Sequence, residues 1–141
     1  MENIHQKTLR IEPAGRGAWI PAAANFLGAA MEADPLAGVE QLRRICTSGD
    51  AQLYIIKSGD YMVGAFVLRI EQKPGGAEGV IVAAGGNLSG VNLMRATLGS
   101  IEQLFKGCVS IRAHISRRGL MRQFARAGYA PREIVVSKAV S

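Results

Sequence analysis

Apolar positions along the chain follow two kinds of spacing, and their order predicts the fold. Apolar residues recur every three or four positions in four segments, which predicts helices over residues 19–33, 36–47, 91–105 and 117–127. Two-residue alternation or short apolar runs predict strands over residues 7–13, 51–56, 61–71, 78–84, 109–115 and 133–140. The predicted order of elements is therefore β-α-α-β-β-β-α-β-α-β.

This order joins an antiparallel meander to strands that are linked by helices. Short turns with glycine at residues 58–60 and 73–76 connect the three central strands, so we expect these strands to pair antiparallel. Strands joined by a crossover helix are normally parallel neighbours. The sequence thus predicts an α/β (mixed α+β) fold: a central mixed sheet of about six strands with helices on both faces, in a single domain over residues 1–141.

Composition is typical of a folded protein, but the charge is unevenly distributed. Hydrophobic residues make up 48% of the chain, and no apolar run approaches the roughly 20 residues that a membrane-spanning helix needs. The net charge is +6, and residues 108–141 carry seven Lys or Arg against one Glu, so the whole excess lies in the last quarter. This patch favours an anionic partner, such as a phosphorylated cofactor, a nucleic acid or an acidic protein face, or it only aids solubility.

The cysteines and histidines do not predict a disulfide framework or a metal site. Cys46 and Cys108 are too few for such a framework, and we expect both to be reduced core thiols in a cytoplasm-like compartment. His5 and His114 lie far from each other and show no metal-ligand spacing with the cysteines. The N-terminus lacks the layout of a signal peptide, so the expected location is cytoplasmic.

A glycine-rich segment at residues 85–90 lies between an apolar strand and a predicted helix. Its glycines let the backbone bend, and the amides of residues 89–92 are expected at the helix start. These amides lack intrahelical acceptors and lie at the positive end of the helix dipole, so such a position binds anions. Glycines between a strand and a helix also occur in plain turns, so this segment alone does not predict a cofactor.

The element order resembles that of the Gcn5-related N-acetyltransferases, the GNAT superfamily. The resemblance covers nearly the whole chain and is strongest from Tyr61 to Tyr129, through EGVIVAAGGNLSG, VNLMRATLGSIEQLFKGC, VSIRAHI and SRRGLMRQFARAGY. The SRRGL…GY ending with a short final strand is also similar to small GNAT-like proteins of bacterial viruses. The resemblance implies that strand 78–84 splays from strand 109–115, with the pantetheine arm of acetyl-CoA in the gap.

The resemblance also implies which residues would hold acetyl-CoA or another acyl-CoA as cosubstrate. The main chain of Val82, Ala83 and Ala84 would pair with the pantetheine arm. The pyrophosphate loop would comprise Gly85, Gly86, Asn87, Leu88, Ser89, Gly90 and Val91, and further phosphate contacts would come from Arg117, Arg118 and Arg122. The family's loop reads Gln/Arg-x-x-Gly-x-Gly/Ala. Only Gly90 matches it, because Leu88 replaces the middle glycine and Gly85 replaces the Gln or Arg.

Two side chains are candidates for the base that takes a proton from the attacking amine. Glu78 begins the apolar strand and resembles a glutamate that some relatives use, but it could be only an exposed strand start. His114 lies on the polar side of the next strand, near the implied splay, but it could be only a structural hydrogen-bonding residue. The family's proton-donating tyrosine aligns with Phe124, which has no proton to give, and the asparagine that the family favours at the start of this helix aligns near Arg117.

Three functions remain open from the sequence. The first is an acyl-CoA-dependent N-acyltransferase that moves an acyl group to a small-molecule or protein amine by direct attack. The second is a catalytically silent protein of the same fold with a structural or binding role, which Phe124 and Leu88 favour. The third is a nucleic-acid-binding module that uses the C-terminal arginines. It would need aromatic rings for stacking, and only Phe124 and Tyr129 lie near those arginines.

Overall fold

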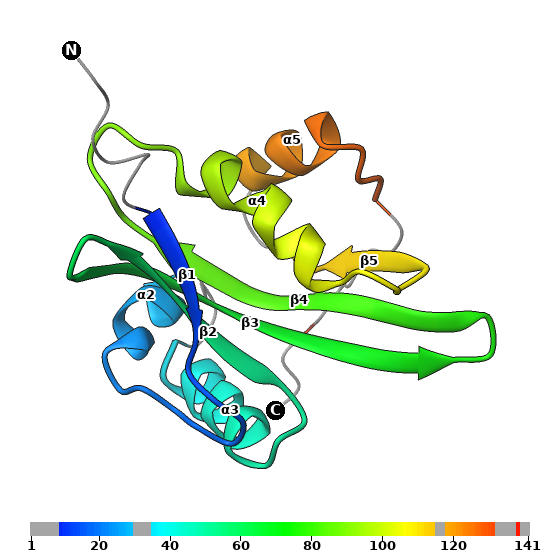
Figure 1. Ribbon diagram of the computed structural model, residues 1–141, viewed down its shortest axis with the longest axis horizontal. Helices are drawn as coiled ribbons and strands as arrows, with labels where there is room; N and C mark the ends of the chain where they lie inside the picture. The colour runs from blue at the N-terminus through cyan, green and yellow to red at the C-terminus, as the bar shows by residue number, and fades with distance from the viewer. Residues whose placement is uncertain (1–8, 30–34, 115–117, 132–137, 139–141) are drawn as a thin grey trace.

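The computed structural model describes residues 9–29, 35–114, 118–131 and 138 (Figure 1). The described strands are β1 (Leu9–Pro13), β2 (Gln52–Ser58), β3 (Tyr61–Lys73), β4 (Gly76–Gly86) and β5 (Ser110–Ala113). The described helices are α2 (Ala23–Ala29), α3 (Pro35–Thr47), α4 (Leu93–Leu104) and α5 (Arg118–Arg126). The predicted order is confirmed for these elements. The final strand predicted over residues 133–140 lies outside the described residues, apart from Lys138.

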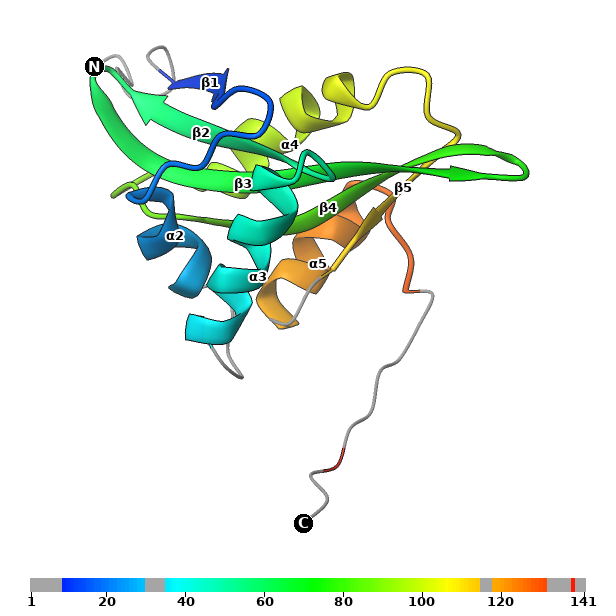
Figure 2. The ribbon, with the colours of Figure 1, turned by 90° about the horizontal axis from the view of Figure 1, so that it is seen from below.

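The strands form one mixed sheet in the order β1-β2-β3-β4-β5. The first three pairings along this order are antiparallel, and β4 pairs with β5 in parallel. The predicted meander and the predicted parallel pairing across a crossover helix are both confirmed. β3 and β4 are longer than the other strands, and their hairpin projects beyond the rest of the sheet (Figures 1 and 2).

Helices cover both faces of the sheet, as predicted. Helices α2 and α3 lie on one face, and α4 and α5 lie on the other (Figure 1). The first face buries a core cluster that includes Leu27 of α2 and Leu42 of α3. The second face buries a cluster that includes Ile101 of α4 and Phe124 of α5. None of the described helices combines the length and the apolar composition needed to cross a bilayer.

The helix predicted to begin at residue 19 begins instead at Ala23. A proline disfavours the helical conformation of the residue before it, so Pro21 keeps Ile20 out of the helix. The chain enters the helix through a tight turn in which the Ala23 N–H donates to the Ile20 carbonyl at 2.9 Å. Trp19 and Ile20 still pack against the core below α2 and α3. The apolar periodicity therefore predicted the burial of Ala23 and Leu27 correctly but placed the helix start too early.

Helix α4 crosses the sheet closely because β4 has a glycine beneath it. A Cβ added to Gly79 would lie 2.5 Å from two atoms of the Phe105 ring, which is closer than any packed contact. Phe105 is itself buried, so the ring has little room to move. Gly99, in the interior of α4, is the opposite case, because a Cβ there would meet no atom within 4 Å.

We expect G79A and G99A to change stability in opposite directions. G79A forces the Phe105 ring to shift and should lower the free energy of unfolding by about 1–3 kcal/mol. G99A removes a flexible residue from a helix interior at an open position and should raise it by about 0.5–1 kcal/mol. Urea unfolding monitored by circular dichroism measures both. The close packing would be contradicted if G79A were as stable as the wild type, and adding F105L to G79A should recover part of the loss.

Candidate functional site

Strands β4 and β5 pair in parallel over a short described length. Their register runs from Glu78 opposite Ser110 to Ile81 opposite Ala113. The last link of this ladder is the His114 N–H, which donates to the Ile81 carbonyl at 3.2 Å. β4 continues to Gly86, but none of the described residues beyond His114 pairs with it on this side. The described ladder therefore ends at Ile81, and the splay that the resemblance implies stays a prediction, because the residues directly after His114 lie outside the described ranges.

A β-bulge lies in β4 at the same place. Val67 of β3 lies opposite Ala83 and Leu68 lies opposite Ile81, so Val82 has no opposite residue. A bulge bends its strand and increases the local twist, which helps two neighbouring strands to part. Val82 and Ala83 both belong to the core between the sheet and helices α2 and α3. Ala84 packs on the other face of the sheet, toward α4. This bulge could not be predicted from the sequence, because an extra residue in an unbroken apolar run leaves the hydrophobic pattern unchanged.

Only part of the segment that was predicted as the pyrophosphate loop, residues 85–91, is a loop in the structure. Gly85 and Gly86 belong to β4 and lie opposite Ala65 and Gly64 of β3. The Asn87 N–H donates to the Val63 carbonyl at 2.8 Å, so this amide is already used within the sheet. The connection proper runs over residues 88–92, where the Val91 N–H donates to the Leu88 carbonyl at 3.1 Å and Gly90 has a positive φ of 75°.

Helix α4 begins two residues later than predicted. Asn92 is its N-cap, and the Asn92 side-chain oxygen accepts a hydrogen bond from the Arg95 N–H at 3.1 Å. The amides of Leu93 and Met94 come directly after the cap, where helix geometry provides no intrahelical acceptor. These two amides, rather than those of Ser89 to Val91, form the positive helix end. The cap residue explains the shift, because Asn strongly favours the position before the first helical residue.

Sequence reasoning missed Arg95 as a candidate anion contact. Arg95 is exposed in the first turn of α4, and that turn contains no acidic residue. A cation near a helix N-terminus is unfavourable unless an anion balances it. The position of Arg95 could therefore have been recognised as unusual from the sequence, if the predicted helix had been started after Asn92.

Glu78 is buried in a group of polar and charged side chains. It is 6% exposed, so its interpretation as an exposed strand start is wrong. Its carboxylate accepts hydrogen bonds from Lys73 at 2.7 Å, from Ser110 at 2.9 Å and from Arg112 at 2.8 Å. Hydrogen bonds from Lys73 and Ser110, together with the charges of Lys73 and Arg112, hold the pKa of Glu78 below its usual range. A carboxylate in this state is a weak base. Its assignment as a catalytic base stays a prediction.

His114 lies at the end of the described ladder between β4 and β5. It directly follows β5, its backbone closes the ladder to β4, and its side chain is exposed. Glu78 pairs with Ser110 at the other end of the same ladder. The structure therefore does not bring the two predicted bases together, and His114 is the one at the end of the ladder from which β4 continues.

The late helix lacks a proton donor at the position where the family has one. Phe124 is buried and packs edge to face against Tyr129, with ring centroids 5.0 Å apart. The Tyr129 hydroxyl donates to Glu102 at 2.9 Å, and burial together with Glu102 raises the pKa of Tyr129. Arg122 is exposed on α5, Arg118 begins that helix, and Arg117 lies outside the described residues.

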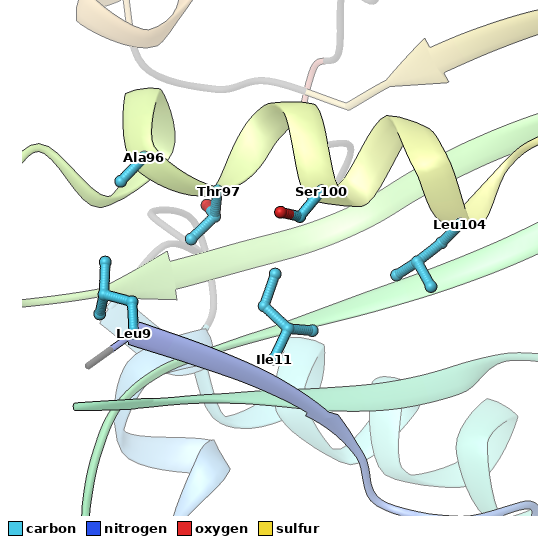
Figure 3. Close-up of a pocket in the computed structure, with 6 residues that line it drawn as sticks. All are labelled: Leu9, Ile11, Ala96, Thr97, Ser100 and Leu104. Carbon is cyan, nitrogen blue, oxygen red and sulfur yellow. The ribbon is translucent and has the colours of Figure 1, made fainter. Parts of the chain in front are cut away.

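A separate cavity of about 320 Å³ lies between β1 and α4 (Figure 3). It is lined by Leu9, Ile11, Ala96, Thr97, Ser100 and Leu104. β1 and β5 are at opposite ends of the strand order, so this cavity is not the gap between β4 and β5. Within the described ranges, no three His, Cys, Asp or Glu side chains gather closely enough to hold a metal ion.

No protein-family model and no curated protein sequence matches this chain. Solved structures do match its fold. A candidate acetyl transferase from Pyrococcus furiosus superposes with a TM-score of 0.73 at 13% sequence identity, over 94% of this chain and 99% of that one. The GCN5-related N-acetyltransferase from Ralstonia eutropha JMP134 gives a TM-score of 0.67 at 14% identity, over 94% and 98%.

A third match is an aminoglycoside acetyltransferase from an uncultured soil metagenomic sample, solved in complex with sisomicin. It gives a TM-score of 0.66 at 14% identity, over 96% of this chain and 97% of that one. Identities this low establish the fold and leave the reaction to be argued from the site. The chain has the mixed-sheet fold of the Gcn5-related N-acetyltransferases over nearly its whole described length.

Proposed function

We propose that this protein is an acyl-CoA-dependent N-acyltransferase that moves an acyl group, in the simplest case acetyl, from CoA to an amine. The observation that carries the proposal is the short described ladder between β4 and β5, which ends at Ile81 while β4 continues to Gly86, together with the bulge at Val82. On this proposal β4 and β5 diverge beyond Ile81, which would leave main-chain groups of β4 open on the β5 side. Unpaired backbone donors and acceptors at such an edge suit an extended, amide-containing arm.

The cosubstrate would be bound mainly by the backbone. Val82, Ala83 and Ala84 would pair with the pantetheine arm along the open side of β4. The turn at residues 88–91 and the amides of Leu93 and Met94 would face the pyrophosphate. The exposed guanidinium groups of Arg95 and Arg122 would add phosphate contacts, and the predicted Arg117 and Arg118 remain candidates for the same role.

In the proposed reaction, the amine nitrogen bonds to the thioester carbonyl carbon and the carbon–sulfur bond breaks. His114 would accept the proton that the amine loses, because it lies at the divergence and is exposed. Phe124 cannot supply a proton to the departing sulfur, so water would protonate it. The free thiols of Cys46 and Cys108 suit the reducing cytoplasm in which we expect this reaction.

Charge restricts the proposed acceptor. The excess positive charge lies in residues 108–141, which include β5 and α5. A polycationic amine would be repelled from this part of the surface. We therefore propose an acceptor with few positive charges, either a small amine or a protein amino group in an acidic context.

The second candidate is a catalytically silent protein of this fold, similar to small proteins of bacterial viruses. The burial of Phe124 favours it, because a core phenylalanine replaces the hydroxyl that would assist turnover. The third candidate, nucleic-acid binding, gains less support. Phe124 is buried, and the ring of Tyr129 packs against it, so neither ring is free for base stacking.

Calorimetric titration should show micromolar binding of CoA and acetyl-CoA to the purified protein. A ligand at 100 times its Kd that binds only the folded state should stabilise it by about 2.7 kcal/mol, which thermal unfolding would detect. Free pantetheine, which lacks the phosphates, is the matched control ligand and should bind far more weakly. Absence of binding at millimolar CoA would contradict the cosubstrate assignment and favour the silent candidate.

Neutralising the proposed phosphate contacts should weaken CoA binding. We expect R95Q and R122Q each to raise the Kd roughly fivefold and to reduce its dependence on salt, because one charge-assisted contact is lost. R44Q is the matched control, since Arg44 is exposed on α3, which covers the opposite face of the sheet. Equal effects of all three substitutions would mean that only net charge matters.

Replacing His114 should slow turnover without weakening CoA binding. With an amine found by screening, H114Q should lower kcat by about 10²–10⁴, the usual contribution of a general base. The readout is release of the CoA thiol, and CoA affinity is measured in parallel. Full turnover by H114Q would remove His114 as the base. E78Q tests the alternative, because a loss of kcat there at unchanged fold would return the role to Glu78.

A further inference from the structure

A group of ionic side chains lies on the sheet face opposite α4, over the paired part of β4 and β5. We call it the Arg112 cluster, and its members are Arg69, Glu71, Lys73, Glu78, Ser110 and Arg112. Arg112 Nη1 donates to Glu78 Oε1 at 2.8 Å, and Arg112 Nη2 donates to both carboxylate oxygens of Glu71 at 3.1 Å. Arg69 also donates to Glu71, at 2.7 Å. The cluster therefore connects three strands through two carboxylates.

Arg112 is the member that reaches furthest. It belongs to β5, and its guanidinium crosses β4 to bind Glu71 on β3. It lies opposite Val80, one pair before the ladder ends at Ile81 and Ala113. The only other described contact of this cluster from β5 comes from Ser110, at the start of the strand. Arg112 is thus the residue of β5 whose side chain binds both β4 and β3, close to the end of the described ladder.

β5 has few other attachments among the described elements. It contains four residues, and its apolar contacts are those of Ile111 and Ala113 on the α4 side. A strand this short, at the end of the described strand order, gains little pairing energy and can slip in register. The side chain of Arg112 restricts that slip, because Nη1 binds Glu78 on β4 while Nη2 binds Glu71 on β3, and both hydrogen bonds hold in only one register.

The charge balance of the cluster does not depend on Arg112. Without Arg112, Glu71 would keep Arg69 and Glu78 would keep Lys73 as cationic partners. The Nε atoms of Arg69 and Arg112 are buried and have no acceptor among the described residues, which carries a desolvation cost. An ion group with this cost contributes more to the specificity of strand placement than to net stability.

From these contacts we infer that Arg112 is a positioning residue: it fixes β5 against β3 and β4, and so sets where the gap beside Val82 opens. The inference rests on the proposed function in one respect, namely that the gap is the place where CoA binds. The attachment of β5 by Arg112 is a property of the chain itself and can be measured without any ligand.

The test compares R112M with R69M, which is a matched control. Both remove one arginine from the cluster and one partner of Glu71, but Arg69 lies on β3 and does not bind β5. Hydrogen–deuterium exchange reports the amides of residues 110–114, including the His114 N–H that closes the ladder. Calorimetry measures the Kd for CoA, at a temperature where every variant is fully folded.

We expect R112M to speed amide exchange in β5 and to raise the Kd for CoA roughly tenfold, and we expect R69M to change neither by more than about twofold. R112K keeps the charge and should recover part of both effects. A role in global stability alone would speed exchange across the whole sheet in both variants and leave the Kd of the folded protein unchanged.

Each remaining outcome decides one claim. Unchanged exchange in β5 of R112M overturns the positioning role, even if the Kd rises, because Arg112 would then act by direct contact or charge. Faster exchange in β5 with an unchanged Kd overturns the claim that Arg112 sets the binding gap. If the wild type binds no CoA, the proposed function fails, and the exchange comparison alone decides whether Arg112 anchors β5.

Discussion

The arrangement of this protein depends on the short parallel ladder between β4 and β5. β4 is paired on both sides from Glu78 to Ile81, and beyond Ile81 the described residues pair with it only on the β3 side. A strand that leaves the two-sided region exposes main-chain groups that need partners. The bulge at Val82 places this change at one residue, and the hairpin with β3 keeps β4 extended beyond it. The candidate site is therefore a consequence of where pairing stops.

The two faces of this ladder are held by different forces. On the α4 side, the Phe105 ring lies against Gly79, and Ile111 packs beside it, so close apolar packing holds the strands. On the opposite side, Arg112 and Glu78 hold them through ionic hydrogen bonds with fixed geometry. Apolar packing supplies most of the stability of such an arrangement, while the directional bonds specify the register.

The sequence predicted the fold better than it predicted the site. Apolar periodicity depends on burial, so the order of elements and the parallel crossover followed from it. Element starts depend on single residues, and the effects of Pro21 and Asn92 shifted two helices. The bulge at Val82 could not be predicted, because it lies inside a uniformly apolar run. The burial of Glu78 could not be predicted either, because it depends on Ser110 and Arg112 from a strand that is more than thirty residues away in the chain.

The proposed recognition by main chain would let the binding site persist even at the 13–14% identities seen with the matched structures. Val82, Ala83 and Ala84 would contribute backbone groups, so their side chains need only fit the core. A loop whose amides and helix dipole bind an anion also tolerates changes such as Leu88 for glycine. A proton donor is different, because it requires one hydroxyl at one place, and Phe124 cannot provide it. In the proposed function, binding and turnover would therefore be separable, because binding would use the backbone and turnover would need a specific side chain.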